Sequence, residues 1–207
     1  MIRYNMRVEN CDVLGPGNRA VIWTQGCSRI PPCKNCIGES ARDPRGGTIA
    51  SVAEMVRWLL DCRGITGITL TGGEPFDQAE GIERLIVAVR EVRPELDLII
   101  YTGYTYDDLI IKGEDNACIS RLLEQTQILI DGPYVEELND GIPYRGSSNQ
   151  RIRVLDPSYV AVAQEYYVQS KGRRIQILAD RHETRMVGVP SLDQAAYWRN
   201  LKRSAID

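Results

Sequence analysis

The sequence predicts an α/β fold built on a parallel sheet. Short apolar segments rich in β-branched residues alternate at least three times with segments in which apolar residues recur at helical spacing. A glycine-containing turn follows each predicted strand, and this alternation is typical of parallel strands joined by crossover helices. The pattern fits either an open doubly wound sheet or part of a barrel. In both architectures, active sites lie at the carboxyl ends of the strands.

The composition restricts the classes of protein to which the chain can belong. It has 207 residues, of which 43% are hydrophobic and 26% charged, so we expect one folded domain with a substantial core. The net charge of −3 gives no general electrostatic reason to bind nucleic acid or membranes. No apolar run approaches the length of a membrane span, and the first residues lack the apolar core of a secretory signal. We therefore expect a cytoplasmic location.

The predicted core elements follow one another as β/α units. The first strand covers residues 20–24 and runs into a cysteine-rich loop. Ser51 and Glu54 have the spacing of a capping box, which begins a helix that should stop near Gly64. The further predicted core elements are strands at 68–71, 96–101 and 128–130, a helix over 78–92 and a helical region at 119–123.

Beyond residue 155 the pattern changes, and the sequence predicts a small tail. Two short strands at 174–178 and 184–189 surround a turn and predict a β-hairpin. Ser191, with Gln194 three residues on, predicts the start of a last helix. The aromatic residues expected to pack this tail on the core are Tyr166, Tyr167 and Trp198.

Three of the six cysteines, Cys27, Cys33 and Cys36, stand directly after the first predicted strand. In a long chain without an export signal, clustered cysteines indicate metal ligands rather than disulfides. The CxxC portion alone fits zinc, a redox dithiol or an iron-sulfur cluster. Zinc would need a fourth ligand, and the only histidine, His182, is distant in sequence and lies in a polar turn. Three cysteines on a cubane cluster would leave one iron open for chemistry.

The other three cysteines stand alone in the sequence. Cys62 lies near the end of a helical pattern and Cys118 lies inside another, so we expect both to be small core residues. The sequence leaves the role of Cys11 undecided.

A second candidate site is the turn Thr71-Gly72-Gly73-Glu74-Pro75 at the end of the second predicted strand. Paired glycines let backbone groups approach a ligand closely, and a neighbouring carboxylate can hold an ammonium group. The same residues also fit a plain tight turn. The position after the strand that follows the cysteine loop favours the ligand site.

Taken together, these motifs resemble a known family. The chain is similar to radical S-adenosylmethionine proteins, and specifically to the anaerobic ribonucleoside-triphosphate reductase activating protein family. Five motifs appear in the family's order within about residues 1–155. They are Gln25-Gly26-Cys27 with Cys33 and Cys36, Thr71-Gly72-Gly73-Glu74-Pro75, Tyr101-Thr102-Gly103-Tyr104-Thr105, Ile130-Asp131-Gly132-Pro133-Tyr134, and Arg145-Gly146-Ser147-Ser148-Asn149-Gln150-Arg151.

The resemblance implies a fold and a cofactor site. The fold would be a partial, laterally open (β/α) barrel, with a radical S-adenosylmethionine core at 1–155 and a C-terminal hairpin and helix at 156–207 packed on it. A [4Fe-4S] cluster would be held by three cysteines, with the methionyl amine and carboxylate of S-adenosylmethionine on the open iron. The implied cluster ligands are Cys27, Cys33 and Cys36. Gly72, Gly73 and Glu74 would contact the methionyl amine, and Thr102, Gly103 and Asp131 would line the rest of the cofactor site.

The resemblance also implies a reaction and partners. The cluster would cleave S-adenosylmethionine reductively to a 5′-deoxyadenosyl radical, which abstracts hydrogen from a glycine Cα of a partner enzyme such as anaerobic ribonucleotide reductase. The enzyme would be an oxidoreductase of the glycyl-radical-activating type. A reducing donor such as flavodoxin or ferredoxin would supply the electron. The protein's own task would be orientation and the exclusion of side reactions.

Two departures from the family keep other functions open. Five residues separate Cys27 from Cys33 where the family has three, and the tail is longer than an activating enzyme needs. A radical S-adenosylmethionine enzyme acting on a precursor peptide or a small molecule therefore remains an alternative. A different class is a non-catalytic iron-sulfur or metal-binding module for electron transfer. That class would need a fourth cysteine ligand and has no use for the Gly72-Gly73-Glu74 turn.

Overall fold

The computed structural model describes residues 1–168, 172–179, 181 and 184–204. In these residues one sheet has the strand order β3-β1-β2-β4-β5-β6-β7, and β8 and β9 form a separate hairpin. The strands are β1 Ile2–Cys11, β2 Arg19–Thr24, β3 Thr48–Ala50, β4 Gly67–Gly72, β5 Asp97–Tyr101, β6 Ile128–Asp131, β7 Arg151–Val154, β8 Ile175–Ala179 and β9 Thr184–Gly188. The α-helices are α1 Val52–Asp61, α2 Ala79–Arg90, α3 Tyr106–Asp115, α4 Ala117–Glu124, α5 Val160–Ala163 and α6 Leu192–Ser204.

The centre of the sheet is parallel. Strands β2, β4, β5 and β6 run in the same direction, while β1, β3 and β7 pair antiparallel at the two sides. The protein is therefore mixed α/β with a mostly parallel central sheet. The partial barrel and the division of the chain at residue 155 remain predictions.

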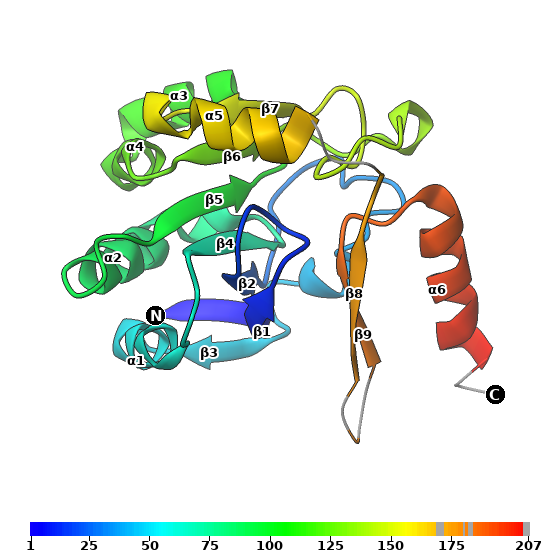
Figure 1. Cartoon of the computed structure of the whole chain (residues 1–207), viewed down its shortest axis with the longest axis horizontal. Helices are drawn as coiled ribbons and strands as arrows, with labels where there is room; N and C mark the ends of the chain where they lie inside the picture. Colours follow the sequence, from blue (N-terminus) through cyan, green and yellow to red (C-terminus); the bar gives the residue numbers. More distant parts are fainter. Residues whose placement is uncertain (169–171, 180, 182–183, 205–207) are drawn as a thin grey trace.

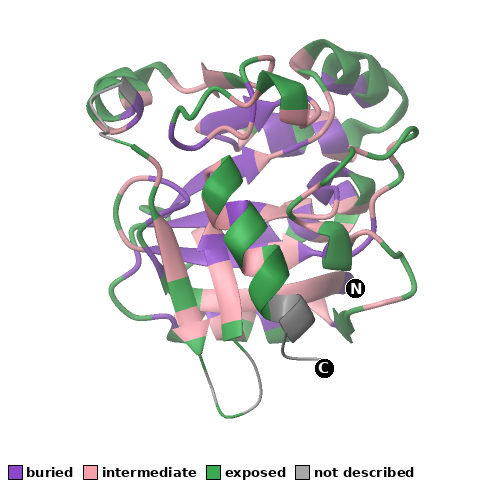
Figure 2. Ribbon diagram, turned by 90° about the vertical axis from the view of Figure 1, so that its right-hand side faces the viewer, coloured by how far each residue is buried: buried purple, intermediate pink, exposed green. Residues whose placement is uncertain are grey.

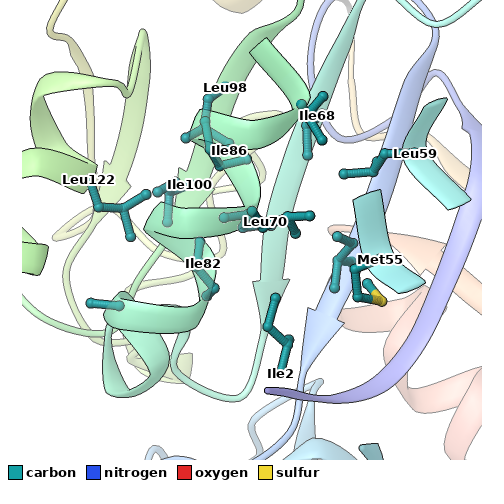
Figure 3. Close-up of a cluster of buried hydrophobic side chains, with 14 of the residues drawn as sticks. Ile2, Met55, Leu59, Ile68, Leu70, Ile82, Ile86, Leu98, Ile100 and Leu122 are labelled. Atoms are coloured by element: carbon teal, nitrogen blue, oxygen red, sulfur yellow. The ribbon is translucent and has the colours of Figure 1, made fainter. Parts of the chain in front are cut away.

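Successive residues of the central strands pack on opposite faces of the sheet. On one face, Leu70 of β4 and Ile100 of β5 are buried with Met55 of α1 and Ile86 of α2 (Figure 3). On the other face, Ile99 of β5 is buried in a separate apolar cluster. Both faces are covered, which explains why the parallel strands consist of nearly continuous apolar residues.

Most of the predicted elements are present. The capping box at the start of α1 is confirmed, because the Glu54 amide donates to Ser51 Oγ at 3.1 Å and the Ser51 amide donates to Glu54 Oε2 at 2.6 Å. The corresponding pair at α6 is also confirmed, with distances of 3.2 and 2.9 Å between Ser191 and Gln194. Helix α1 ends at Asp61, shortly before the predicted stop.

Five elements were not predicted, namely β1, β3, β7, α3 and α5. The segment assigned as the first strand is β2, because the antiparallel strand β1 precedes it. Strand β1 is mostly half-buried or exposed and lacks the continuous apolar run of the parallel strands. Helix α3 buries only Leu109 and Gly113 in its ten residues, so its apolar pattern is weak. Helix α5 has four residues, too few to show a helical period.

The C-terminal extension packs on the core. Figure 1 shows the β8–β9 hairpin and α6 lying beyond the carboxyl ends of β4 and β5. Tyr166 and Tyr167 pack on Tyr144 with ring centroids 4.6 and 4.9 Å apart, which confirms the prediction for these two tyrosines. Val187 of β9 is buried in one cluster with Val21 of β2. None of the described helices combines the length and the apolar character that a membrane crossing requires.

Arg173 fastens the extension to the core through carbonyl oxygens. Its guanidinium donates to the carbonyls of Ile142 at 3.0 Å, Arg145 at 2.6 Å and Gly146 at 3.2 Å, all in the loop before β7. It also donates to the Pro190 carbonyl at 2.6 Å, at the end of the hairpin. One side chain thus joins both ends of the hairpin to the core.

A buried ion pair lies at the amino ends of the parallel strands. Arg19 of β2 is fully buried and pairs with Asp97 of β5. Three of its remaining four donors are also satisfied, by Thr69 Oγ1 at 2.6 Å, the Ile68 carbonyl at 2.7 Å and the Pro16 carbonyl at 3.1 Å. Removing one partner of such a pair leaves an uncompensated charge in the interior.

We therefore expect Arg19→Met to lower the free energy of unfolding by about 3–5 kcal/mol. Urea unfolding followed by circular dichroism measures this change. Arg84→Met is the matched control, because Arg84 and Glu80 form an ion pair whose side chains are 66% and 67% exposed. That change should cost no more than about 0.5 kcal/mol. Equal effects of the two substitutions would contradict the prediction.

Candidate functional site

A cavity of about 480 Å³ lies at the carboxyl ends of the parallel strands. Its volume is in the range of about 300–1,000 Å³ that is typical of small-ligand sites. Its walls come from the cysteine loop, from the turns after β4 and β5, and from the C-terminal extension. The predicted site residues that line it are Cys27, Cys33, Cys36, Gly72, Gly73, Glu74, Thr102 and Gly103.

The three predicted cysteine ligands meet at this cavity as free, half-buried thiols. Burial raises the pKa of the Cys36 thiol, and the neighbouring thiols of Cys33 and Cys27 add to this rise, so the three groups lie within electrostatic reach of one another. Among the described residues, no three Cys, His, Asp or Glu side chains are placed to bind a single metal ion. Three thiols are one short of the closed four-ligand shell of a structural zinc, and in a cubane cluster each thiolate binds a different iron.

The other cysteines lie away from the cavity lining. Cys62 is buried in the main core, which confirms that prediction, whereas Cys118 is half-buried and packs against the edge of that core. Cys11, whose role the sequence left undecided, is buried in an apolar cluster with Leu14. His182 lies outside the described residues. The described part of the chain therefore offers no fourth cysteine at the cavity.

Contacts with the core position the first half of the cysteine loop. The Gly26 amide donates to the Ala41 carbonyl at 2.8 Å. Ser28 donates to the Asp77 carboxylate through its amide at 2.7 Å and through its hydroxyl at 2.8 Å. The Ser28 hydroxyl is also 2.9 Å from the Tyr104 hydroxyl. Asp77 and Tyr104 thus hold the residue next to Cys27.

Two glutamates position the second half of the loop. The side-chain nitrogen Nδ2 of Asn35 donates to Glu136 Oε2 at 2.6 Å, and Lys34 forms an ion pair with Glu137 at 3.2 Å. Asn35 has a φ of 53°, a left-handed conformation that asparagine tolerates better than most residues. Glu136 Oε1 also lies 3.6 Å from Arg199 of α6. One carboxylate therefore contacts both the segment between Cys33 and Cys36 and the C-terminal helix.

The paired glycines are required by close backbone packing. The Gly73 amide donates to the Thr24 carbonyl at 2.9 Å, and the Glu74 amide donates to the Gly26 carbonyl at 2.8 Å. A Cβ atom on Gly73 would lie 2.0 Å from the Gly26 oxygen. Gly72 has a φ of +102°, and its Cβ would lie 2.6 Å from the Thr24 oxygen. The turn thus packs directly against the start of the cysteine loop while it lines the cavity.

Glu74 joins this turn to the turn after β5. Its side chain is buried, and its carboxylate accepts hydrogen bonds from Thr102 Oγ1 and the Gly103 amide, both at 2.8 Å. The Phe76 amide donates a third bond at 3.1 Å. Burial raises the pKa of the Glu74 carboxyl to about 7, although these three bonds oppose the rise. The structure gives Glu74 an internal role that the sequence did not predict.

Asp131, which was also predicted for the cofactor site, is not among the residues that line the cavity, so its place there stays a prediction. Its carboxylate accepts from the Tyr106 amide at 2.8 Å and pairs with Arg153 of β7 at 3.0 Å. Both oxygens are thereby used to fasten β6 to the start of α3 and to β7. Its neighbour Gly132 lines the cavity instead.

Comparisons with known proteins agree with this geometry. Residues 13–153 match the model of a family described as "4Fe-4S single cluster domain". The chain is 35% identical over 152 residues to the anaerobic ribonucleoside-triphosphate reductase-activating protein of Enterobacteria phage T4, which covers 70% of this chain and 90% of the phage protein. The chain belongs to the anaerobic ribonucleoside-triphosphate reductase-activating protein family.

Two bacterial members of this reductase-activating family show similar identity. The protein of Escherichia coli K12 is 31% identical over 150 residues, covering 69% of this chain and 92% of its own length. The protein of Vibrio cholerae is 31% identical over 147 residues, covering 68% of this chain and 90% of its own length. Each match leaves close to a third of this chain uncovered.

The C-terminal extension supplies cavity residues outside the matched family model. Figure 2 shows β8, β9 and α6 standing in front of the central sheet. The extension residues that line the cavity are Thr184, Arg185, Met186, Gly188, Val189, Pro190, Leu192, Ala195, Trp198 and Arg199. None of these was predicted as a site residue. The only sequence signal for them was a tail longer than the reductase-activating family requires.

The raised pKa of Glu74 predicts a pH dependence of stability. Because the folded-state pKa of about 7 lies above the usual value of 4.5, the folded protein keeps a proton that the unfolded chain releases between these values. The carboxyl group therefore lowers the free energy of unfolding as the pH rises through this window, by about 3 kcal/mol, and adds no change above it.

Urea unfolding of the cluster-free protein and of Glu74→Gln, at several pH values from about 4.5 to 8, isolates this contribution. We expect the free energy of unfolding of the wild type, minus that of the variant, to fall as the pH rises to about 7. A difference that is constant with pH would show that Glu74 titrates normally.

Proposed function

We propose that this protein uses a [4Fe-4S] cluster to cleave S-adenosylmethionine reductively and so generates a glycyl radical on a partner enzyme. One observation carries the proposal. Three thiols and no fourth cysteine line the same cavity as the strand-end turns, in a chain of the reductase-activating family. A cluster with three protein ligands leaves one iron for a small molecule, and the cavity provides space beside it.

The residues of the cavity fit this assignment. Cys27, Cys33 and Cys36 would hold the cluster, and the turns at Gly72-Gly73 and Thr102-Gly103 would contact S-adenosylmethionine. The chemistry that the bound pair supplies is reductive cleavage of the sulfonium, which yields methionine and a 5′-deoxyadenosyl radical. A one-electron donor such as flavodoxin or ferredoxin would be required.

The protein itself orients the ligands. The turn containing Gly73 is fixed against the cysteine loop by backbone hydrogen bonds, and the Glu74 carboxylate fixes it against the turn after β5. Apolar side chains complete the cavity, among them Trp23 and Met186. A reactive radical is protected from side reactions when its site is rigid and dry.

The family relationship supports a protein substrate. The relatives are named as activating proteins of anaerobic ribonucleoside-triphosphate reductase, so the proposed partner is an anaerobic ribonucleotide reductase. A second candidate function is favoured by the extension. Because β9 and α6 form one wall of the cavity, they narrow access to it, which suits a peptide segment or a small molecule as substrate.

Replacing Cys33 with alanine should remove both the iron and the cleavage activity, because the remaining two thiols cannot hold the cluster. After anaerobic reconstitution, iron analysis and assay of 5′-deoxyadenosine under strong reductant measure the two effects. Cys118→Ala is the matched control, since Cys118 is half-buried on α4 and outside the cavity lining. Iron binding that survives Cys33→Ala would show that the ligand assignment is wrong. If the wild-type protein holds its cluster but cleaves no S-adenosylmethionine, the proposed enzymatic function is wrong.

Mixing the reconstituted protein with reduced donor, S-adenosylmethionine and an anaerobic ribonucleotide reductase should produce a glycyl radical on the reductase. Electron paramagnetic resonance detects this radical. Replacing the radical-bearing glycine of the reductase with alanine is the control and should abolish the signal. Release of 5′-deoxyadenosine without a radical on the reductase would favour the peptide or small-molecule alternative.

A further inference from the structure

Arg29 occupies the longer gap between the first two cysteines. The neighbouring Ser28 is fixed by two hydrogen bonds to Asp77, so the start of this gap has a defined position. From there the Arg29 side chain reaches the turn after β5, where its Nη1 donates to the Gly103 carbonyl at 3.0 Å. Arg29 lines the same cavity as the three cysteines.

The rest of the Arg29 guanidinium has no partner in the described chain. Its Nε is buried without a hydrogen bond, and no described carboxylate lies within ion-pair distance of it. Its Nη2 has no hydrogen-bond partner either. A buried donor without a partner is costly, and in native proteins such a donor usually pairs with an ordered water, an ion or a ligand.

The acidic groups that face Arg29 are already engaged. Both oxygens of Glu74 accept hydrogen bonds from Thr102, Gly103 and Phe76. Asp108 and Thr105 form the capping box of α3. Asp108 attracts Arg29 electrostatically but forms no hydrogen bond or ion pair with it. Asp77 binds Ser28. The positive charge of Arg29 is therefore available to an anionic group in the cavity.

The free edge of the guanidinium suits a carboxylate. The Nε–H and Nη2–H groups of arginine are parallel and form a fork that binds the two oxygens of a carboxylate together. In Arg29 the nitrogen already in use is Nη1, on the other edge. The Gly103 hydrogen bond thus orients the guanidinium and leaves the Nε–Nη2 edge unpaired.

We propose that Arg29 binds the carboxylate of the methionyl group of S-adenosylmethionine through Nε and Nη2. This inference rests on the proposed function. In this assignment the five-residue gap between Cys27 and Cys33 supplies a cofactor-binding residue as well as the spacing of the two thiols. Arg29 is a binding residue in this assignment and takes no part in electron transfer.

The test compares two ligands that differ in the carboxylate. Binding of S-adenosylmethionine and of decarboxylated S-adenosylmethionine to the full-length, reconstituted protein is measured by equilibrium dialysis, without reductant. We expect Arg29→Gln to weaken binding of S-adenosylmethionine about 10- to 100-fold. Its affinity for the decarboxylated ligand should change less than about twofold. Arg29→Lys keeps the charge but loses the fork, and should give an intermediate loss.

Arg45→Gln is the matched control. It removes the same charge near the end of the cysteine loop, but the Arg45 side chain is 89% exposed and does not line the cavity. Both ligands should bind this variant as they bind the wild type. Iron content should be unchanged in all three variants, which shows that the cluster is intact.

The outcomes separate this inference from the function on which it rests. Equal weakening of both ligands by Arg29→Gln would mean that Arg29 only holds the turn at Gly103, and would overturn the inference alone. Unchanged binding of both would do the same. A wild-type protein that holds its cluster but does not bind S-adenosylmethionine would overturn the proposed function and this inference together.

Discussion

The site depends on the close contact between the backbone of the Gly73 turn and the start of the cysteine loop. The Glu74 amide bonds the Gly26 carbonyl, and no side chain larger than hydrogen fits on Gly73 beside that oxygen. This contact sets the position of Cys27 relative to the end of β4. The buried carboxylate of Glu74 then extends the connection to Thr102 and Gly103 after β5. Three strand ends are thus held as one rigid floor of the cavity.

The sequence predicted this floor because its elements have strong local signals. Parallel strands buried on both faces are almost continuously apolar, and the glycines and cysteines stand at their ends. Strand β1 was not predicted because most of its residues are half-buried or exposed and it lacks a continuous apolar run. Asp131 was assigned to the cofactor site because the family resemblance implies that its motif lies there. Its position in the sequence could not show that Arg153 and the Tyr106 amide use its carboxylate.

The local pattern predicted the hairpin and the last helix of the extension, but it could not predict that they form a wall of the cavity. It depends on contacts between residues far apart in the sequence, such as the bonds of Arg173 to the carbonyls of the loop before β7. The matched family model ends at residue 153, so the floor lies within the matched region and this wall lies beyond it. The wall lines the cavity without contributing any of the three cysteines.

The carboxylate of Glu136 contacts both of these parts of the site. It accepts from Asn35 between two of the cysteines and lies near Arg199 on α6. The extension therefore reaches the cysteine loop by a polar contact as well as lining the cavity with its own side chains. One glutamate of the loop before β7 thus serves two segments that are more than 160 residues apart in the sequence.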